Sequence, residues 1–380
     1  MLFCALSTAE TAPFLRRSIL PQQKDNKSMK VRSQKHLLNT SRGEKPSRYP
    51  IWFLRQAGRY LPEYRKIRSQ MSFLELCQNP QKAAEVTLQP LKRFDLDGAI
   101  IFSDILIIPA YMGQQLSFDA GHGPKLQPCV RTSKDLTKLK IPNIDQEISF
   151  LGEAIALSKS QLAAHQTMIG FAGAPFTVAS YMIEGSGSKN FSEVKKLLYQ
   201  DPDTFVSLLE MLAEASSQYL KMQIKAGAEV IMLFDTWAGN LTSADYREYV
   251  LPSLKSLLES LQDTGTPVIY YSGQGGENLA QLQGAKLDVL AVDWRVPLSR
   301  AAKILHECNN MKVIQGNLDP MIVSWGDESL VRAKVREVLD EAKKGGFPGH
   351  IFNVGHGVLP STSCDALNWV IDEVHKHPVL

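Results

Sequence analysis

Two arginines four residues apart, Arg55 and Arg59, are well suited to bind an anion. Each guanidinium can hold a carboxylate through two parallel charge-assisted hydrogen bonds. The pair directly follows the apolar segment 50–54, and the intervening Ala57 and Gly58 favour a loop. Two arginines on a solvent-exposed helix are the more common meaning of this spacing, but the preceding apolar segment favours a ligand-binding loop.

Asp104 and His356 are further titratable residues that directly follow apolar segments. Taken alone, Asp104 more often caps a helix, and a histidine between two glycines more often lies in a turn. These two side chains are too few for a metal cage, and no lysine stands at these positions to form a Schiff base. Arginines with one carboxylate and one histidine suit the binding of a polyanion and the stabilisation of a positive charge that develops on it.

The composition is that of an ordinary globular protein. Its 380 residues, 44% hydrophobic and 21% charged, suffice for one large domain or two modest ones. Five scattered cysteines form no Cys-x-x-Cys pair, which argues against a disulfide framework. No apolar stretch is long enough to predict a membrane-spanning helix.

Positive charge is concentrated in residues 1–49, which carry ten Lys and Arg against three Asp and Glu. The remainder is slightly acidic, so no nucleic-acid partner is predicted. We expect residues 1–35 to form a disordered basic extension, either a transit peptide or the product of an upstream start codon with Met29 as the true start. The expected location is the cytoplasm, or a plastid if the extension is a transit peptide.

Eight short apolar segments recur along the chain and read as strands buried on both faces. They lie at residues 51–54, 99–102, 168–171, 230–234, 268–271, 289–292, 313–315 and 351–354. Segments with helical periodicity lie between them, among them 202–226 and 330–344. Strands that alternate with helices predict an α/β fold with a parallel sheet, and eight strands predict a single-domain TIM (β/α)8 barrel. An open doubly wound sheet is the alternative, but no GxGxxG motif follows the first strand.

In a TIM barrel the chemistry lies directly after the carboxyl ends of the strands. Most of the eight predicted ends carry a titratable residue or a glycine turn that suits close approach of a ligand. These positions are Arg55–Arg59, Ser103–Asp104, Ala172–Pro175, Asp235–Gly239, Ser272–Gly273, Asp293–Trp294, Gly316–Pro320 and Gly355–Gly357. The pattern predicts a functional site at this end of the barrel.

Six of the segments also resemble the uroporphyrinogen decarboxylase family, in the same order along the chain. They are residues 52–60, 87–106 (TLQPLKRFDLDGAIIFSDIL), 169–184, 233–239 (LFDTWAG), 315–320 (QGNLDP) and 353–360 (NVGHGVLP). The resemblance runs from residue 38 to residue 377 and implies a decarboxylase domain over residues 36–380. It further implies a TIM barrel that acts as a homodimer, without metal or organic cofactor, on the four acetate groups of uroporphyrinogen III.

The resemblance also implies roles for particular residues. Asp104 would accept hydrogen bonds from the pyrrole N–H groups and offset the cation that forms on protonation. Arg55 and Arg59 would bind carboxylates, with Arg55 a candidate proton donor although arginine is a poor acid at neutral pH. The loop residues Gln56, Ala57 and Gly58 would add main-chain contacts.

Three more residues receive roles from the same resemblance. Tyr181 would orient Asp104 through its hydroxyl group, Thr236 would contact a carboxylate, and His356 would bind a carboxylate after the last strand. Phe171 and Phe234 would form walls of the pocket.

Two other functions remain open at this point. One is a zinc-dependent corrinoid methyltransferase of the same barrel superfamily, although His356 stands where a metal-binding cysteine would be expected. The other is a non-catalytic tetrapyrrole-binding protein. Neither a nucleic acid nor a membrane is an expected partner.

Overall fold

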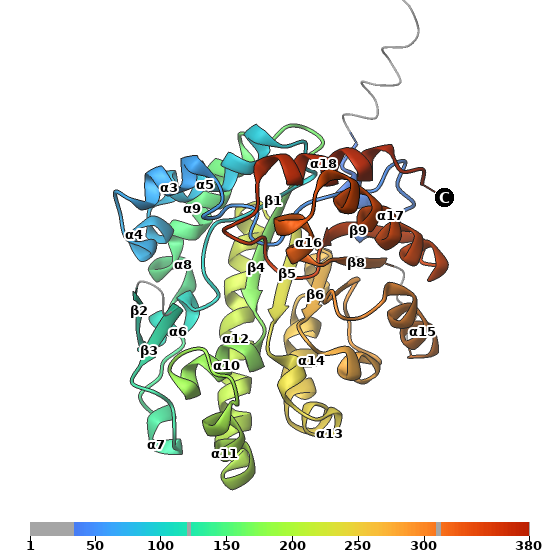
Figure 1. Ribbon diagram of the computed structural model, residues 1–380. Helices are drawn as coiled ribbons and strands as arrows, with labels where there is room; N and C mark the ends of the chain where they lie inside the picture. The colour runs from blue at the N-terminus through green and yellow to red at the C-terminus, as the bar shows by residue number, and fades with distance from the viewer. Residues whose placement is uncertain (1–33, 120–122, 309–312, 380) are drawn as a thin grey trace, which may run out of the picture.

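Seven parallel strands form one curled sheet in the computed structural model, which describes residues 34–119, 123–308 and 313–379 (Figure 1). Their order in the sheet is β1-β4-β5-β6-β7-β8-β9, and every neighbouring pair is parallel. The strands are β1 (Gly98–Ile100), β4 (Thr167–Gly173), β5 (Val230–Asp235), β6 (Val268–Ser272), β7 (Val289–Val292), β8 (Val313–Leu318) and β9 (Gly349–Val354). Each of them contains or overlaps a predicted strand.

The eighth predicted strand, at residues 51–54, lies between the two edge strands of this sheet. Phe352 in β9 donates its N–H to Pro50 O at 2.8 Å, and Ile51 forms a parallel bridge with Phe352. On the other side Asp97, directly before β1, donates its N–H to Ile51 O at 2.9 Å. The predicted TIM barrel is therefore confirmed, with its first strand reduced to one bridge.

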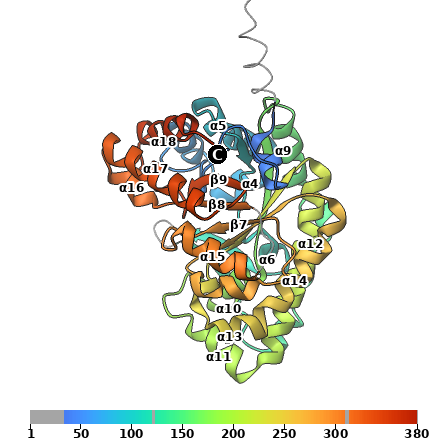
Figure 2. The same cartoon turned by 90° about the vertical axis from the view of Figure 1, so that its right-hand side faces the viewer.

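Helices surround the sheet, and the last ones, from α15 to α18, lie beside β7 to β9 (Figure 2). The α-helices are α2 (His36–Ser41), α3 (Pro62–Arg68), α4 (Phe73–Gln78), α5 (Pro80–Arg93), α6 (Ile107–Tyr111), α7 (Ser133–Leu136), α8 (Ile144–Glu147), α9 (Ser149–Lys159), α10 (Pro175–Glu184), α11 (Ser192–Gln200), α12 (Pro202–Ala226), α13 (Ser243–Asp245), α14 (Leu251–Ser260), α15 (Leu298–Cys308), α16 (Pro320–Trp325), α17 (Glu328–Lys344) and α18 (Cys364–Lys376). Short 3-10 helices lie at Ala238–Asn240, Gln262–Thr264 and Gly276–Leu282, and a π-helix at Tyr246–Val250. None of the described helices is long and apolar enough to cross a membrane.

Local sequence signals explain where the helices begin and end. Helix α12 spans the predicted residues 202–226: the Asp201 side chain accepts the Thr204 N–H at 3.2 Å, and Gly227, at φ 120°, ends the helix. Helix α17 begins two residues before the predicted start because the Asp327 side chain caps it.

A two-stranded antiparallel hairpin, β2 (Gln115–Asp119) with β3 (Gly123–Gln127), stands apart from the barrel and was not predicted. Its strands are short and mostly polar, so they carry little of the apolar signal by which a strand is recognised. The N–H of Leu126 in β3 bonds to Gly185 O at 2.9 Å, directly after α10. The hairpin is thereby attached to the loop that follows a helix of the barrel.

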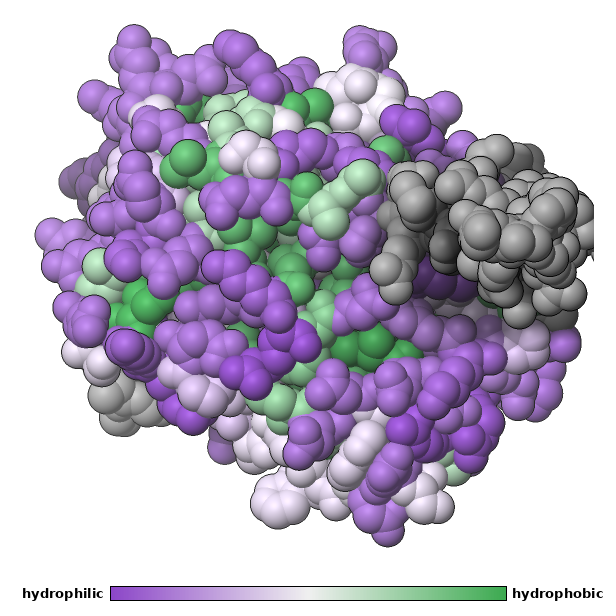
Figure 3. All heavy atoms as spheres, turned by 90° about the horizontal axis from the view of Figure 1, so that it is seen from above, coloured by the Kyte–Doolittle hydropathy of each residue, from purple (hydrophilic) through white to green (hydrophobic). Residues whose placement is uncertain are grey.

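The core fills the barrel and the layer between sheet and helices. Strands β4, β6, β7, β8 and β9 are buried along their whole length, as expected for a sheet covered on both faces. The surface seen from above is largely hydrophilic, with smaller hydrophobic areas between (Figure 3). Apolar burial of this extent is the main stabilising term for such a domain.

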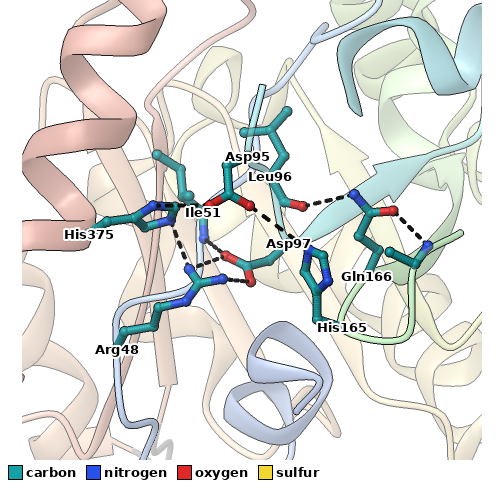
Figure 4. Close-up of polar contacts among 9 residues, drawn as sticks. Arg48, Ile51, Asp95, Leu96, Asp97, His165, Gln166 and His375 are labelled. Atoms are coloured by element: carbon teal, nitrogen blue, oxygen red, sulfur yellow. Dashed lines mark hydrogen bonds and ion pairs between the residues drawn. The ribbon is translucent and has the colours of Figure 1, made fainter. Parts of the chain in front are cut away.

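A charged cluster joins the first strand segment to β1 (Figure 4). Arg48 donates from Nη1 and Nη2 to the two oxygens of Asp97, at 2.9 and 2.6 Å, and Asp97 also accepts the Ile51 N–H at 2.8 Å. Arg48 further donates to His375 Nε2 in α18 at 2.8 Å, and burial together with this guanidinium lowers the pKa of His375 to about 4. The neutral histidine can therefore accept this hydrogen bond.

Most of the predicted extension, residues 1–33, lies outside the described residues. Residue 35 already belongs to the folded protein, because Lys35 forms an ion pair of 2.6 Å with Glu229. Helix α2 begins at His36.

Candidate active site

The loop after residues 50–54 is held in a backbone conformation that most side chains avoid. Arg55 has φ 59°, in the left-handed region, which costs about 1–3 kcal/mol for a residue other than glycine. Hydrogen bonds on both sides maintain it: Gln56 N–H to Phe53 O at 3.0 Å, and Val358 N–H to Leu54 O at 2.8 Å. Such enforced strain is typical of functional sites.

The predicted loop residues behave differently from one another. The Gln56 side chain is fully buried, with its Nε2 donating to Gly98 O at 2.9 Å and its Oε1 accepting the Phe53 N–H at 3.2 Å. Its side chain therefore fixes the loop and is not available to a ligand. Ala57 and Gly58 are partly exposed and Arg59 is exposed.

Gly355 and Gly357 allow the loop after β9 to pack closely against Trp294 and Arg55. A Cβ on Gly357 would overlap the Arg55 side chain, lying 2.7 Å from its Cγ, and a Cβ on Gly355 would lie 2.6 Å from the Cα of Trp294. His356 between them is half-buried. The pKa of His356 lies below its ordinary value of 6.5. Burial is the largest cause, and the positive charge of Arg55 lowers this pKa further. At neutral pH its imidazole is therefore uncharged and can donate one hydrogen bond to a carboxylate.

Asp104 lies four residues after the end of β1 and is half-buried. Its Oδ1 accepts the Leu106 N–H at 2.8 Å, directly before α6, so the helix-cap role that the sequence left open is partly present. Burial raises the pKa of Asp104 to about 6, whereas the Leu106 N–H and the nearby Arg55 lower it. Asp104 thus lies within electrostatic reach of Arg55 and remains largely ionised at neutral pH.

Tyr181, in α10, lies close to the same carboxylate. Burial raises its pKa first and the Asp104 charge raises it further, whereas Trp237 and Arg55 lower it. The ring of Tyr181 packs on Trp237 with centroids 6.0 Å apart. Among the described contacts there is no hydrogen bond between the Tyr181 hydroxyl and Asp104, so their coupling in this structure is electrostatic.

Arg59 is exposed and lies near Tyr64. Its guanidinium is near Tyr64, whose pKa it lowers slightly against burial, and the Tyr64 ring packs on Phe102 with centroids 5.8 Å apart. Phe102 precedes Asp104 by two residues. Arg55 thus acts electrostatically on Asp104, whereas Arg59 acts on Tyr64, a neighbour of Phe102.

The remaining predicted residues lie after β4 and β5. Thr236 directly follows β5 and is half-buried, with a side chain that can reach solvent. Phe171 and Phe234 contact each other edge to face, with centroids 5.6 Å apart, and Phe234 packs in the same way on Tyr271 at 6.3 Å. This aromatic row runs across β4, β5 and β6.

Two residues that the sequence did not single out, Tyr271 and Arg295, also lie at this end, together with Asp293, which was predicted only as a strand-end position. Tyr271 donates its hydroxyl to Gly355 O at 3.0 Å, and Asp293, at 1% exposure, accepts three hydrogen bonds from Arg295, two of them from the side chain. Tyr270 and Tyr271 are consecutive in a strand, so their side chains point to opposite faces of the sheet. The sequence alone did not show which of the two tyrosines faces the interior of the barrel. Tyr270 instead bonds to Asp235 at 2.7 Å in a buried network.

The chain has one His-x-Cys sequence, at residues 306–308, but it lies in α15 and not at a strand end. The ring of His306 bonds to Gly345 O at 2.9 Å and stacks on Phe347. Within the described residues no three His, Cys, Asp or Glu side chains converge as a metal site requires.

The fold is a parallel barrel, and its candidate site lies at the carboxyl ends of the strands. The sequence model for the family described as "Uroporphyrinogen decarboxylase (URO-D)" matches residues 32–377. The chain therefore belongs to the uroporphyrinogen decarboxylase family.

Individual relatives agree with this assignment. The chain is 43% identical over 339 residues to the uroporphyrinogen decarboxylase of Syntrophotalea carbinolica, an alignment that covers 89% of this chain and 96% of that protein. It is 44% identical over 338 residues to that of Streptomyces avermitilis, covering 89% and 93% of the two chains.

Solved structures of similar fold include a methyltransferase from Methanosarcina mazei. Its TM-score is 0.75 at 18% identity, covering 90% of this chain and 98% of that one. At such low identity the likeness concerns the fold alone.

Proposed function

We propose that this chain removes the four acetate carboxyl groups of uroporphyrinogen III, leaving methyl groups and releasing carbon dioxide to give coproporphyrinogen III. This decarboxylation belongs to haem and chlorophyll biosynthesis. The observation that carries the proposal is the half-buried Asp104 within reach of Arg55 at the strand ends of a URO-D family member. The substrate, with many carboxylates around four pyrroles, suits a site supplied with arginines.

The electrons of the breaking carbon–carbon bond pass into the substrate's own pyrrole. Protonation of the pyrrole carbon beside the acetate arm gives a cation, which accepts those electrons as carbon dioxide leaves and an exocyclic methylene group remains. A proton then adds to this methylene carbon to make the methyl group, and loss of the proton from the ring carbon restores the pyrrole. Asp104 accepts hydrogen bonds from the pyrrole N–H groups, and its negative charge stabilises the cation. Burial of the site strengthens the attraction between the two charges. The chemistry needs no metal and no organic cofactor.

The groups around Asp104 bind and orient the carboxylate arms. Arg55 and Arg59 each bind a carboxylate, and the neutral His356 donates a hydrogen bond to a third. The Thr236 hydroxyl adds a hydrogen bond after β5. Main-chain groups of residues 56–58, from Gln56 to Gly58, line the edge of the site.

The proton reaches the pyrrole carbon through the groups beside Arg55. Arg55 itself, or a water molecule or substrate carboxyl that it holds, is the donor. We expect the Tyr181 hydroxyl to orient Asp104 when substrate binds, because the described contacts include no hydrogen bond between the two. Phe171 with Phe234 supplies a wall against the flat faces of the substrate.

Anaerobic incubation with uroporphyrinogen, followed by chromatography of the products, tests this function. We expect stepwise loss of four carboxyl groups. Unchanged substrate that still binds would instead indicate a non-catalytic tetrapyrrole-binding protein. Zinc-dependent methyl transfer, in contrast, would need a converging donor set, so stoichiometric zinc in purified protein would favour that alternative.

We further propose a homodimer that acts in the cytoplasm, with residues 1–35 as an extension in front of a decarboxylase domain at 36–380. Three large apolar side chains on α16 and α17 support a subunit contact: Trp325 is 74% exposed, Met321 50% and Leu330 45%. Such a group of exposed apolar residues is typical of interaction surfaces. Light scattering of the purified protein measures the subunit number.

A further inference from the structure

A third arginine, Arg295, lies at the same end of the barrel and has no role in the function proposed above. It follows β7 by three residues, and its side chain is 47% exposed. Its Nη1 donates to both oxygens of Asp293, at 2.9 and 2.8 Å, and its main-chain N–H donates to the same carboxylate at 2.9 Å. Asp293 is 1% exposed, so it anchors the guanidinium from the inner side.

Trp294 contacts this guanidinium from one side. The Cζ atom of Arg295 lies over the Trp294 ring, 4.3 Å from its centre, which is a cation–π contact. Among the described contacts, Nε and Nη2 of Arg295 have no hydrogen-bond partner. The side chain is therefore held in place while two of its donors remain free to bind an anion.

The loop of His356 places this guanidinium beside the proposed substrate site. Gly355 packs against the backbone of Trp294, and Gly357 packs against the side chain of Arg55. Tyr271 connects the two sides, because its hydroxyl lies 3.0 Å from Gly355 O and 3.5 Å from Asp293 Oδ2. Arg55 and Arg295 thus stand on the two sides of one histidine, and both lower the pKa of His356.

We propose that Arg295 is a carboxylate-binding residue of the active site, which holds one side-chain carboxylate of the substrate across His356 from Arg55. The inference rests on the proposed function. A guanidinium that already lies in its binding conformation binds a carboxylate with less loss of entropy than a free one. The substrate also has more carboxylates than the other proposed residues can pair.

Steady-state kinetics of four variants with uroporphyrinogen test this role. Arg295→Ala removes the guanidinium. Arg295→Lys keeps the positive charge but loses the planar pair of N–H donors that can bind a carboxylate through two parallel hydrogen bonds. The double variant Asp293→Asn with Arg295→Ala avoids an unpaired buried carboxylate, which separates loss of binding from loss of stability. Arg336→Ala is the matched control, because this arginine is 49% exposed and paired with Glu373 on the outer helices.

We expect KM to rise about tenfold in Arg295→Ala and in the double variant, with kcat within about twofold, because a charged hydrogen bond contributes roughly this much. The KM of Arg295→Lys should lie between the KM of these two variants and that of the wild type. The KM of Arg336→Ala should equal the wild-type value. A wild-type KM in Arg295→Ala, or a KM restored in the double variant, would overturn the inference. Wild-type protein without any turnover would instead overturn the proposed function itself.

Discussion

The carboxyl group of Asp104 experiences opposing influences. Burial raises its pKa to about 6, while one backbone N–H and Arg55 act in the other direction. Burial makes this carboxylate costly to ionise in the empty site. The electrostatic stabilisation that it provides is therefore largest when a cation forms beside it in the transition state. The same group therefore links the pH dependence of the reaction, the catalytic rate and the stability of the folded protein.

The acid side of the pH profile should report this pKa. We expect kcat/KM to fall tenfold per pH unit below about pH 6, because the protonated Asp104 no longer stabilises the cation. The measurement is kcat/KM between pH 4.5 and 8 in the free enzyme. An acid limb near pH 4, the ordinary range of an aspartate, would contradict it.

Asp104→Asn should separate rate from binding. We expect kcat to fall roughly 100- to 1000-fold with KM within about threefold, the loss seen when one preorganised electrostatic contact is removed. Asp288→Asn makes the same change at the opposite end of the barrel, where Asp288 accepts the N–H of Val268, and should keep normal turnover. Near-normal kcat in Asp104→Asn would refute the assigned role.

The same substitution should not destabilise the protein. Because the folded pKa of Asp104 is raised, its favourable contribution is present below about pH 4 and is lost as the pH rises through about 6. Asparagine stays neutral, so above pH 6 the variant should equal or exceed the wild type by on the order of 1 kcal/mol. Urea unfolding at pH 5 and pH 8 measures the difference, which should be larger at pH 8.

Three strand-end loops form the site by packing on one another. Residues 355–357 lie between the loop of Arg55 and the loop of Trp294, and both contacts require a residue without a Cβ. The side chain of Arg55 is thereby pressed against the backbone of Gly357. The position of the first arginine thus depends on the last strand of the barrel.

Gly357→Ala should displace Arg55. Its new Cβ would lie within 2.7 Å of Arg55 Cγ, so the arginine must move, and we expect KM to rise at least about fivefold because a carboxylate contact is lost. Gly187→Ala is the control, since nothing lies within 4 Å of its Cβ. Equal KM values for both variants would show that the contact does not position Arg55.

The two ends of the barrel have different tasks. Charged groups at the carboxyl ends face a site, whereas Arg48, Asp97 and His375 at the other end join the first strand segment, β1 and α18 (Figure 4). Asp97 is fully buried, and burial raises its pKa despite the adjacent Arg48. This cluster connects segments far apart in the chain where the barrel closes.

Arg48→Ala should therefore destabilise the entire domain. Loss of the partner leaves Asp97 buried and unpaired, which costs about 3–5 kcal/mol in comparable cases. Adding Asp97→Asn should recover part of this loss. In contrast, Lys334→Ala removes an exposed ion pair with Glu337 and should change the unfolding free energy by less than about 1 kcal/mol. Urea unfolding of the four proteins gives the comparison, and an unchanged value for Arg48→Ala would contradict it.

The sequence alone determined the barrel, because buried parallel strands are recognisable as apolar segments, and it determined which residues follow the strands, whose carboxyl ends must meet on one side. It did not determine which strand-end side chains face inward. Tyr271 faces inward and Tyr270 outward, and Asp293 fixes the position of the Arg295 side chain. These outcomes depend on strand register and on contacts between loops distant in the chain, which local sequence does not encode.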